Sequence, residues 1–104
     1  MIYEFGQESP LQIMRMLSER VRKRRLEKGY SRKFLSEASG VPVASIIRFE
    51  KDAAISLESF VKIAQTLGYN ESLKSLLAIP QYSTMEELET INKNQSRKRG
   101  DKTK

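Results

Sequence analysis

The chain has 104 residues, which is enough for one small domain and little more. It contains no cysteine and no histidine, so disulfides, thiolate or histidine metal sites and a histidine general base are excluded, and no cofactor is expected. No apolar run is long enough to cross a bilayer and no signal-peptide pattern opens the chain, which predicts a cytoplasmic protein that does not bind membranes.

The net charge of +6 is unevenly distributed along the chain. Residues 15–33 contain nine lysines and arginines against two glutamates, and residues 97–104 contain five against one aspartate. Positive charge gathered in this way is typical of a surface that binds phosphates. A solvated helix face followed by a soluble tail is the alternative interpretation of the same composition.

Residues 1–9 precede the first predicted helix as an arm. Ile2, Tyr3 and Phe5 alternate weakly with other residues, which is compatible with a short strand. An isolated strand needs a partner, and a second copy of the chain could supply it. A frayed terminus is the alternative.

The first helix begins at Ser9 and Pro10, because a serine N-cap followed by proline at the first helical position is a favourable start. It extends to about Lys28, and Gly29 ends it. Apolar residues at intervals of three and four predict one stripe that packs on the core. These residues are Leu11, Met14, Leu17 and Val21.

The stretch Ser31–Lys51 predicts two short helices joined by a tight turn. Ser31 is suited to cap the first helix, Gly40 to the turn, and Pro42 to the start of the second helix. In the second helix Ile46 and Phe49 form the apolar side, with Ile47 as a further candidate for it, and the outward positions are Val43, Ala44, Ser45 and Arg48. A unit of this form inserts the N-terminal end of its second helix into the major groove of DNA.

The segment YSRKFLSEASGVPVASIIRFEK resembles the helix-turn-helix of the Cro/cI-type (Xre) repressors, with LSERVRKRRLEKG before it and ISLESFVKIAQTLGY after it. The resemblance covers about Leu17 to Leu77 and implies an all-α, lambda-repressor-like domain of five helices over residues 10–79. Three departures stand out. The reading helix opens with an apolar segment at residues 42–44, where a polar residue is usual. Arg32 replaces a common glutamine, and Asp52 stands where a left-handed glycine often follows.

The resemblance also implies which residues contact DNA. Those that would face bases are Arg32, Val43, Ala44, Ile47 and Arg48. Those that would contact phosphates are Ser31, Ser45 and Lys51. Arg48 can reach guanine O6 and N7, whereas Val43 and Ala44 can offer only apolar contacts, for which the thymine methyl is the natural target. Partial burial in the core is the alternative for Val43.

The resemblance further pairs Arg25, which lies one turn after Val21 on the inner side of the first helix, with Glu50. A half-buried arginine needs a carboxylate partner, so we interpret the pair as a structural link between the first helix and the end of the reading helix. A phosphate contact by Arg25 is the alternative.

Two further helices complete the predicted domain, at residues 57–67 after Ser56 and from Glu71 to about Ala78 after Asn70. Pro80 then separates residues 80–104, in which Thr84 and Glu87 form a capping box at the start of a sixth helix before a basic disordered tail. This helix is too short to be stable alone and must dock on its own domain, a second subunit or another protein. Its apolar residues are Met85, Leu88 and Ile91.

Three hypotheses for function follow, and none is enzymatic, since no catalytic motif is present. The first is a homodimeric repressor that binds a palindromic operator in double-stranded DNA and regulates its own expression. Its dimer interface would use Ile2, Tyr3 and Phe5, or Met85, Leu88 and Ile91. The second is a HipB-type antitoxin, because IPQYSTMEELETINKNQSRKRG resembles the tail of Xre-type proteins encoded beside HipA-type kinase toxins. The third is a protein-interaction module that has lost DNA binding.

Overall fold

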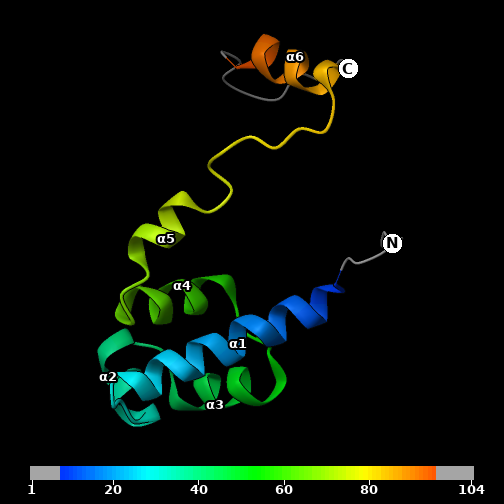
Figure 1. Cartoon of the computed structure of the whole chain (residues 1–104). Coiled ribbons are helices and arrows are strands. Elements are labelled where there is room, and N and C mark those ends of the chain that lie inside the picture. Colours follow the sequence, from blue (N-terminus) through cyan, green and yellow to red (C-terminus); the bar gives the residue numbers. More distant parts are fainter. Residues whose placement is uncertain (1–7, 96–104) are drawn as a thin grey trace. The chain divides into compact units, whose positions relative to one another are not determined.

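The computed structural model describes residues 8–95, and every regular element in this part of the chain is a helix (Figure 1). The helices are α1 (Pro10–Glu27), α2 (Arg32–Ser39), α3 (Val43–Asp52), α4 (Leu57–Thr66), α5 (Asn70–Ser75) and α6 (Met85–Asn94). This confirms the all-α prediction; the predicted arm with Ile2, Tyr3 and Phe5 and the basic tail lie outside the described residues. None of the described helices combines the length and hydropathy needed to span a bilayer.

The chain divides into two compact units, Met1–Lys74 and Ser75–Lys104. The division falls inside α5, earlier than the boundary after residue 79 that the sequence predicts. α5 also ends at Ser75 rather than near Ala78. The chain turns immediately after it, and Leu77 adopts the left-handed region at φ 61°, which cannot continue a helix.

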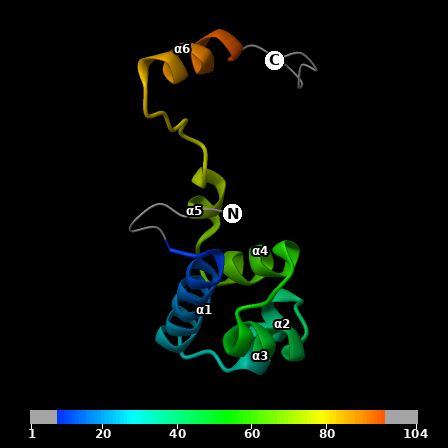
Figure 2. The ribbon, with the colours of Figure 1, turned by 90° about the vertical axis from the view of Figure 1, so that its right-hand side faces the viewer.

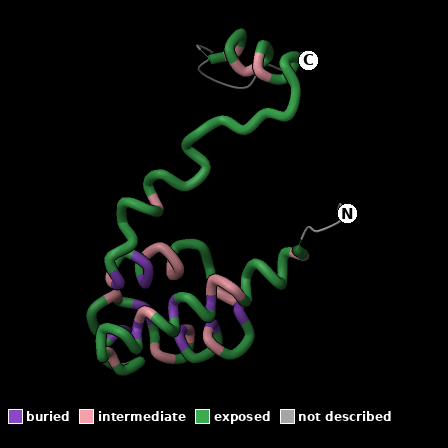
Figure 3. Tube along the Cα trace, viewed as in Figure 1, coloured by how far each residue is buried: buried purple, intermediate pink, exposed green. Residues whose placement is uncertain are grey.

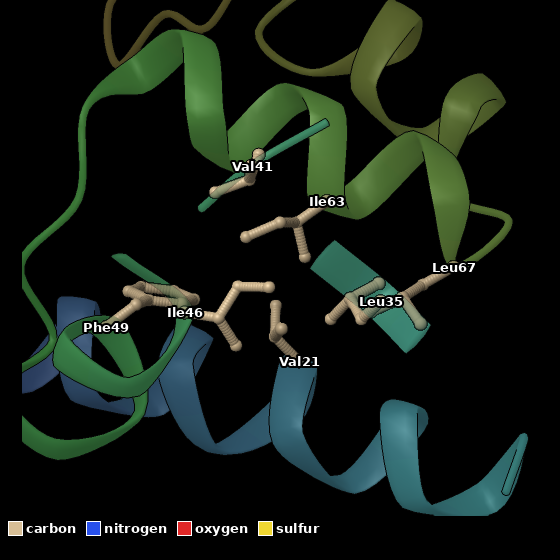
Figure 4. Close-up of a cluster of buried hydrophobic side chains, with 7 residues drawn as sticks. All are labelled: Val21, Leu35, Val41, Ile46, Phe49, Ile63 and Leu67. Carbon is tan, nitrogen blue, oxygen red and sulfur yellow. The ribbon is translucent and has the colours of Figure 1, made fainter. Parts of the chain in front are cut away.

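The core of the first unit is formed by α1 to α4 and the turns between them (Figures 1 and 2). Figure 4 shows the buried side chains converging from these elements: Val21, Leu35, Val41, Ile46, Phe49, Ile63 and Leu67. The rings of Phe49 and Phe60 meet edge to face, with centroids 5.9 Å apart. α5 contributes no fully buried residue, so the buried side chains of this core come from α1 to α4 and the turns between them. Leu73 is only half-buried, and Leu76 is exposed.

Serine hydroxyls fix the start of three of these helices. Ser9 accepts a hydrogen bond from the backbone N–H of Gln12, and the Gln12 side chain accepts one from the N–H of Ser9, which closes a capping box. Ser31 accepts from the N–H of Phe34, and Ser56 accepts from the N–H of Ser59. Each hydroxyl thereby satisfies a first-turn donor that has no partner within the helix.

The end of α3 differs from the prediction by one residue. Asp52 is the last helical residue, and the left-handed conformation falls on Ala53, at φ 58°. A β-carbon in this conformation costs about 1–2 kcal/mol. Burial of the Ala53 methyl group and a 2.8 Å hydrogen bond from its N–H to the carbonyl of Phe49 offset that cost.

The apolar stripe of α1 is only partly covered. Val21 is buried and Leu17 is half-buried, but Leu11 and Met14 are exposed, Met14 by 39%. The reason is length: α1 has 18 residues and spans about 27 Å, whereas α3 and α4 have 10 residues each. The N-terminal half of α1 therefore extends past the core, and Figure 3 shows it as largely exposed.

In the second unit, Thr84 caps α6 by accepting from the N–H of Glu87 at 3.0 Å. The expected capping box does not close on Thr84, because the Glu87 carboxylate instead accepts from the N–H and the hydroxyl of Ser83 at 3.3 and 3.2 Å. Met85 is exposed, and Leu88 and Ile91 are half-buried.

Candidate nucleic-acid interface

One face of α3 is buried and the opposite face is free. Ile46 and Phe49 pack into the core and fix the rotation of the helix about its axis. Positions one and two turns apart on the other side then form an exposed stripe, which we call the α3 outer stripe. Its residues are Ala44, Ile47, Arg48 and Lys51.

The outer stripe changes character along the helix. Ala44 and Ile47 lie in the N-terminal half and are apolar, and the Ile47 side chain is 45% exposed. Arg48 and Lys51 follow and are cationic and exposed. For Val43 the sequence allowed two interpretations, contact with a base or partial burial in the core. In the structure it is half-buried at the edge of the stripe.

The N-terminus of α3 has no side-chain cap. Pro42 occupies the N-cap position, and only its carbonyl takes part, accepting from the N–H groups of Ser45 at 2.9 Å and Ile46 at 3.2 Å. Backbone N–H groups at the start of a helix carry a partial positive charge and attract anions. Because no side chain covers them here, the start of α3 can approach the acceptor groups of DNA directly.

A three-residue ion-pair network joins α3 to the two preceding helices. Arg25 of α1 donates to both carboxylate oxygens of Glu50, from Nε at 2.9 Å and from Nη2 at 3.3 Å, and its Nη1 donates to the carbonyl of Tyr30 at 2.8 Å. The side chains of Arg25 and Glu50 are only 6% and 4% exposed. Such a bidentate pair is strong and directional, so it holds α1 against the end of α3.

The third member of the network is Arg32, at the start of α2. Its Nε donates to Glu50 Oε1 at 2.9 Å, while the side chain remains 46% exposed. Arg32, one of the residues expected to face bases, therefore forms an ion pair with a carboxylate of the protein itself. Four of its five N–H donors are not engaged by Glu50, and its neighbour Lys33 is also exposed.

Two further contacts hold the site and were not anticipated from the sequence. The buried Ser18 hydroxyl on α1 donates to the carbonyl of Phe49 on α3 at 2.7 Å. Arg24 Nε donates to the carbonyl of Leu67 at 3.3 Å, which satisfies an acceptor at the end of α4. Ser18 precedes the buried Val21 by three residues, so helical spacing alone predicts that the serine lies on the inner face of α1.

The residues expected to contact DNA lie on α2, on α3 or at the N-cap of α2, and these two helices pack against each other. Ser31 and Lys51 are exposed and Ser45 is half-buried. Exposed cations also lie along α1: Arg15, Arg20, Arg22, Lys23 and the adjoining Lys28. The first unit thus combines an exposed helix N-terminus with a concentration of positive charge on the elements around it.

Residues 21–74, just over half of the chain, match a helix-turn-helix family. No curated protein and no solved structure matches the chain significantly. The matched segment includes α2, the Gly40 turn and α3, together with the arginine and the glutamate of the buried pair. The chain belongs to the Cro/cI-type (Xre) helix-turn-helix family and is a DNA-binding transcription regulator.

Proposed function

We propose that the protein is a homodimeric repressor that recognises a palindromic operator and represses its own expression. The observation that supports this most directly is the α3 outer stripe, an exposed face on a helix whose opposite face is locked in the core. A rigid reading helix gives base contacts a fixed register, and the surrounding cations bind phosphates. Repression needs only that the bound protein occupy the promoter.

The dimer is proposed because one helix-turn-helix contacts too few base pairs to single out an operator in a genome. A two-fold dimer presents two reading helices about 34 Å apart, to half-sites one helical turn apart. The exposed apolar residues on the first turns of α1, which directly follow the arm, support an interface there. They are Leu11, Ile13 and Met14. In this proposal Ile2, Tyr3 and Phe5 of the arm pair across the two-fold axis.

The test combines binding with a cellular readout. Fluorescence anisotropy with the DNA upstream of the protein's own gene should give a Kd well below that for scrambled DNA of equal composition. Expression of a reporter gene driven by the same DNA should decrease when the protein is produced. Equal affinity for both duplexes would contradict operator recognition. An increase in reporter expression would show that the protein activates transcription instead of repressing it. If the protein binds no DNA at all, the interaction-module hypothesis takes its place.

A second candidate function rests on the second unit. α6 has ten residues, exposes Met85 and carries Leu88 and Ile91 on the same side, and a helix this short needs a partner surface for stability. We propose as the alternative that the protein is an antitoxin whose α6 binds a kinase-like toxin. Purification from the native host should then recover a stable complex that is lost when the chain is truncated after residue 79. Recovery of the protein without a partner would contradict the antitoxin hypothesis and leave the repressor hypothesis.

A further inference from the structure

The N-terminal part of the reading helix offers almost no hydrogen-bonding side chain to DNA. Pro42, Val43 and Ala44 are apolar, and the next outward residue on the stripe, Ile47, is also apolar. Ser45 lies among them but is half-buried and to one side of the stripe. This end of α3 therefore cannot read bases through the usual bidentate amide or guanidinium contacts.

The major groove contains one apolar group, the C5 methyl of thymine. We propose that Ala44 and Ile47, flanked by Val43, determine specificity by packing against thymine methyl groups, so that each half-site carries thymine opposite the first turns of α3. This inference rests on the proposed operator recognition and names what the operator contains. The exposed area of Ile47 is the surface that such contacts would bury.

The order of residues along the stripe fits this assignment. A helix-turn-helix inserts the N-terminal end of its second helix, so Ala44 and Ile47 lie closest to the base edges. Arg48 and Lys51 follow one turn later, where long cationic side chains reach a guanine edge or the phosphates. The cations thus complement the charge of the DNA, while the apolar residues meet its methyl groups.

The size of the effect follows from the hydrophobic transfer of one methyl group. Burial of about one CH₂ equivalent changes affinity by roughly 0.8 kcal/mol, which is about fourfold. Loss of the two symmetry-related methyl groups from a palindrome then lowers affinity by about 15-fold. Deoxyuridine is the suitable probe, because it removes only the methyl group and leaves base pairing unchanged.

The experiment begins with selection of a bound duplex from a randomised library. Each thymine of the half-site is then replaced by deoxyuridine, symmetrically in both halves, and the Kd is measured by anisotropy at fixed salt. We expect a loss of about 15-fold at one or two positions and little change elsewhere. The Ile47→Ala and Ala44→Ser variants should bind the thymine duplex more weakly and lose most of the difference between thymine and deoxyuridine at those positions.

Lys51→Gln is the matched control on the same stripe. It should weaken binding to the thymine and deoxyuridine duplexes by the same factor and leave their ratio unchanged. If deoxyuridine is tolerated at every position while the selected duplex still binds specifically, methyl reading is wrong and operator recognition stands. If selection yields no preferred sequence, operator recognition fails and the inference fails with it. Circular dichroism of each variant checks that α3 remains folded.

Discussion

Replacement of Glu50 by alanine tests the link between the fold and the reading helix. In the wild type the carboxylate accepts three hydrogen bonds, two from Arg25 and one from Arg32. Its removal leaves the Arg25 guanidinium in a site that is only 6% exposed, with the Tyr30 carbonyl as its remaining acceptor. A buried charge without its counter-charge is strongly unfavourable.

Breaking a buried ion pair typically costs about 3–5 kcal/mol. The lower end applies here, because Arg25 keeps the Tyr30 carbonyl and the half-exposed Arg32 can turn to solvent. Since 1 kcal/mol shifts the Tm of a domain of this size by about 4–8 °C, Glu50→Ala should lower the Tm by roughly 12–24 °C. Urea denaturation should show the same loss as a lower midpoint with an unchanged slope.

Glu37→Ala is the matched control, since Glu37 is an exposed glutamate on α2 and its removal should change stability by less than about 0.5 kcal/mol. The double variant Glu50→Ala with Arg25→Met should recover part of the loss, because no buried charge then remains unpaired. A Glu50→Ala protein with the Tm of the wild type would refute the reasoning. It would mean that the pair contributes nothing to the packing of α1 against α3.

Three further predictions concern single contacts. Arg48→Ala should relax specificity at one base pair per half-site and cost about 1–3 kcal/mol of binding free energy, whereas Lys51→Ala should weaken binding to all duplexes alike. A randomised operator library measures both effects. A uniform loss of affinity in both variants would mean that the roles are misassigned. Ser18→Ala should lower the free energy of unfolding by about 1 kcal/mol in urea titrations, because the Phe49 carbonyl loses a buried donor. Met14→Glu should shift the proposed dimer towards monomer in analytical ultracentrifugation, whereas Leu57→Glu, at another exposed apolar position, should not; equal effects would move the interface away from α1.

The starts of four of the described helices were predictable because they depend on local hydrogen bonds. Ser9, Ser31, Ser56 and Thr84 each cap a helix within three residues of their own position, and this information lies in a short stretch of sequence. The end of α3 was misplaced by one residue because the left-handed Ala53 is stabilised by burial, which is a property of the whole fold.

The limits of the apolar pattern are seen in α1 and α5. Periodicity identifies the face on which Leu11 and Met14 lie, but it carries no information on whether another element extends far enough to cover that face. The same applies to Leu76, which a helical pattern assigns to a buried face, although α5 ends at Ser75 and Leu76 is exposed.

The site shows a similar division. Family resemblance placed the candidate DNA-facing residues on or next to α2 and α3, because the order of the motif fixes their position along the chain. It did not indicate that Arg32 would be held by Glu50, 18 residues away, because long side chains choose partners by three-dimensional proximity. The spacing from Ser18 to Val21 indicates that Ser18 faces inward, but its acceptor, the Phe49 carbonyl 31 residues away, is likewise set by three-dimensional proximity.

The most direct test of DNA binding through the exposed cations of α1, α2 and α3 is the dependence of affinity on salt. If about three of these exposed cations contact phosphates in each subunit, the proposed dimer releases enough counterions to give a slope of log K against log salt near −5. Anisotropy titrations of the wild type at salt concentrations from about 50 to 200 mM should give this slope, because added salt weakens phosphate contacts strongly over this range. A slope close to zero would contradict the account.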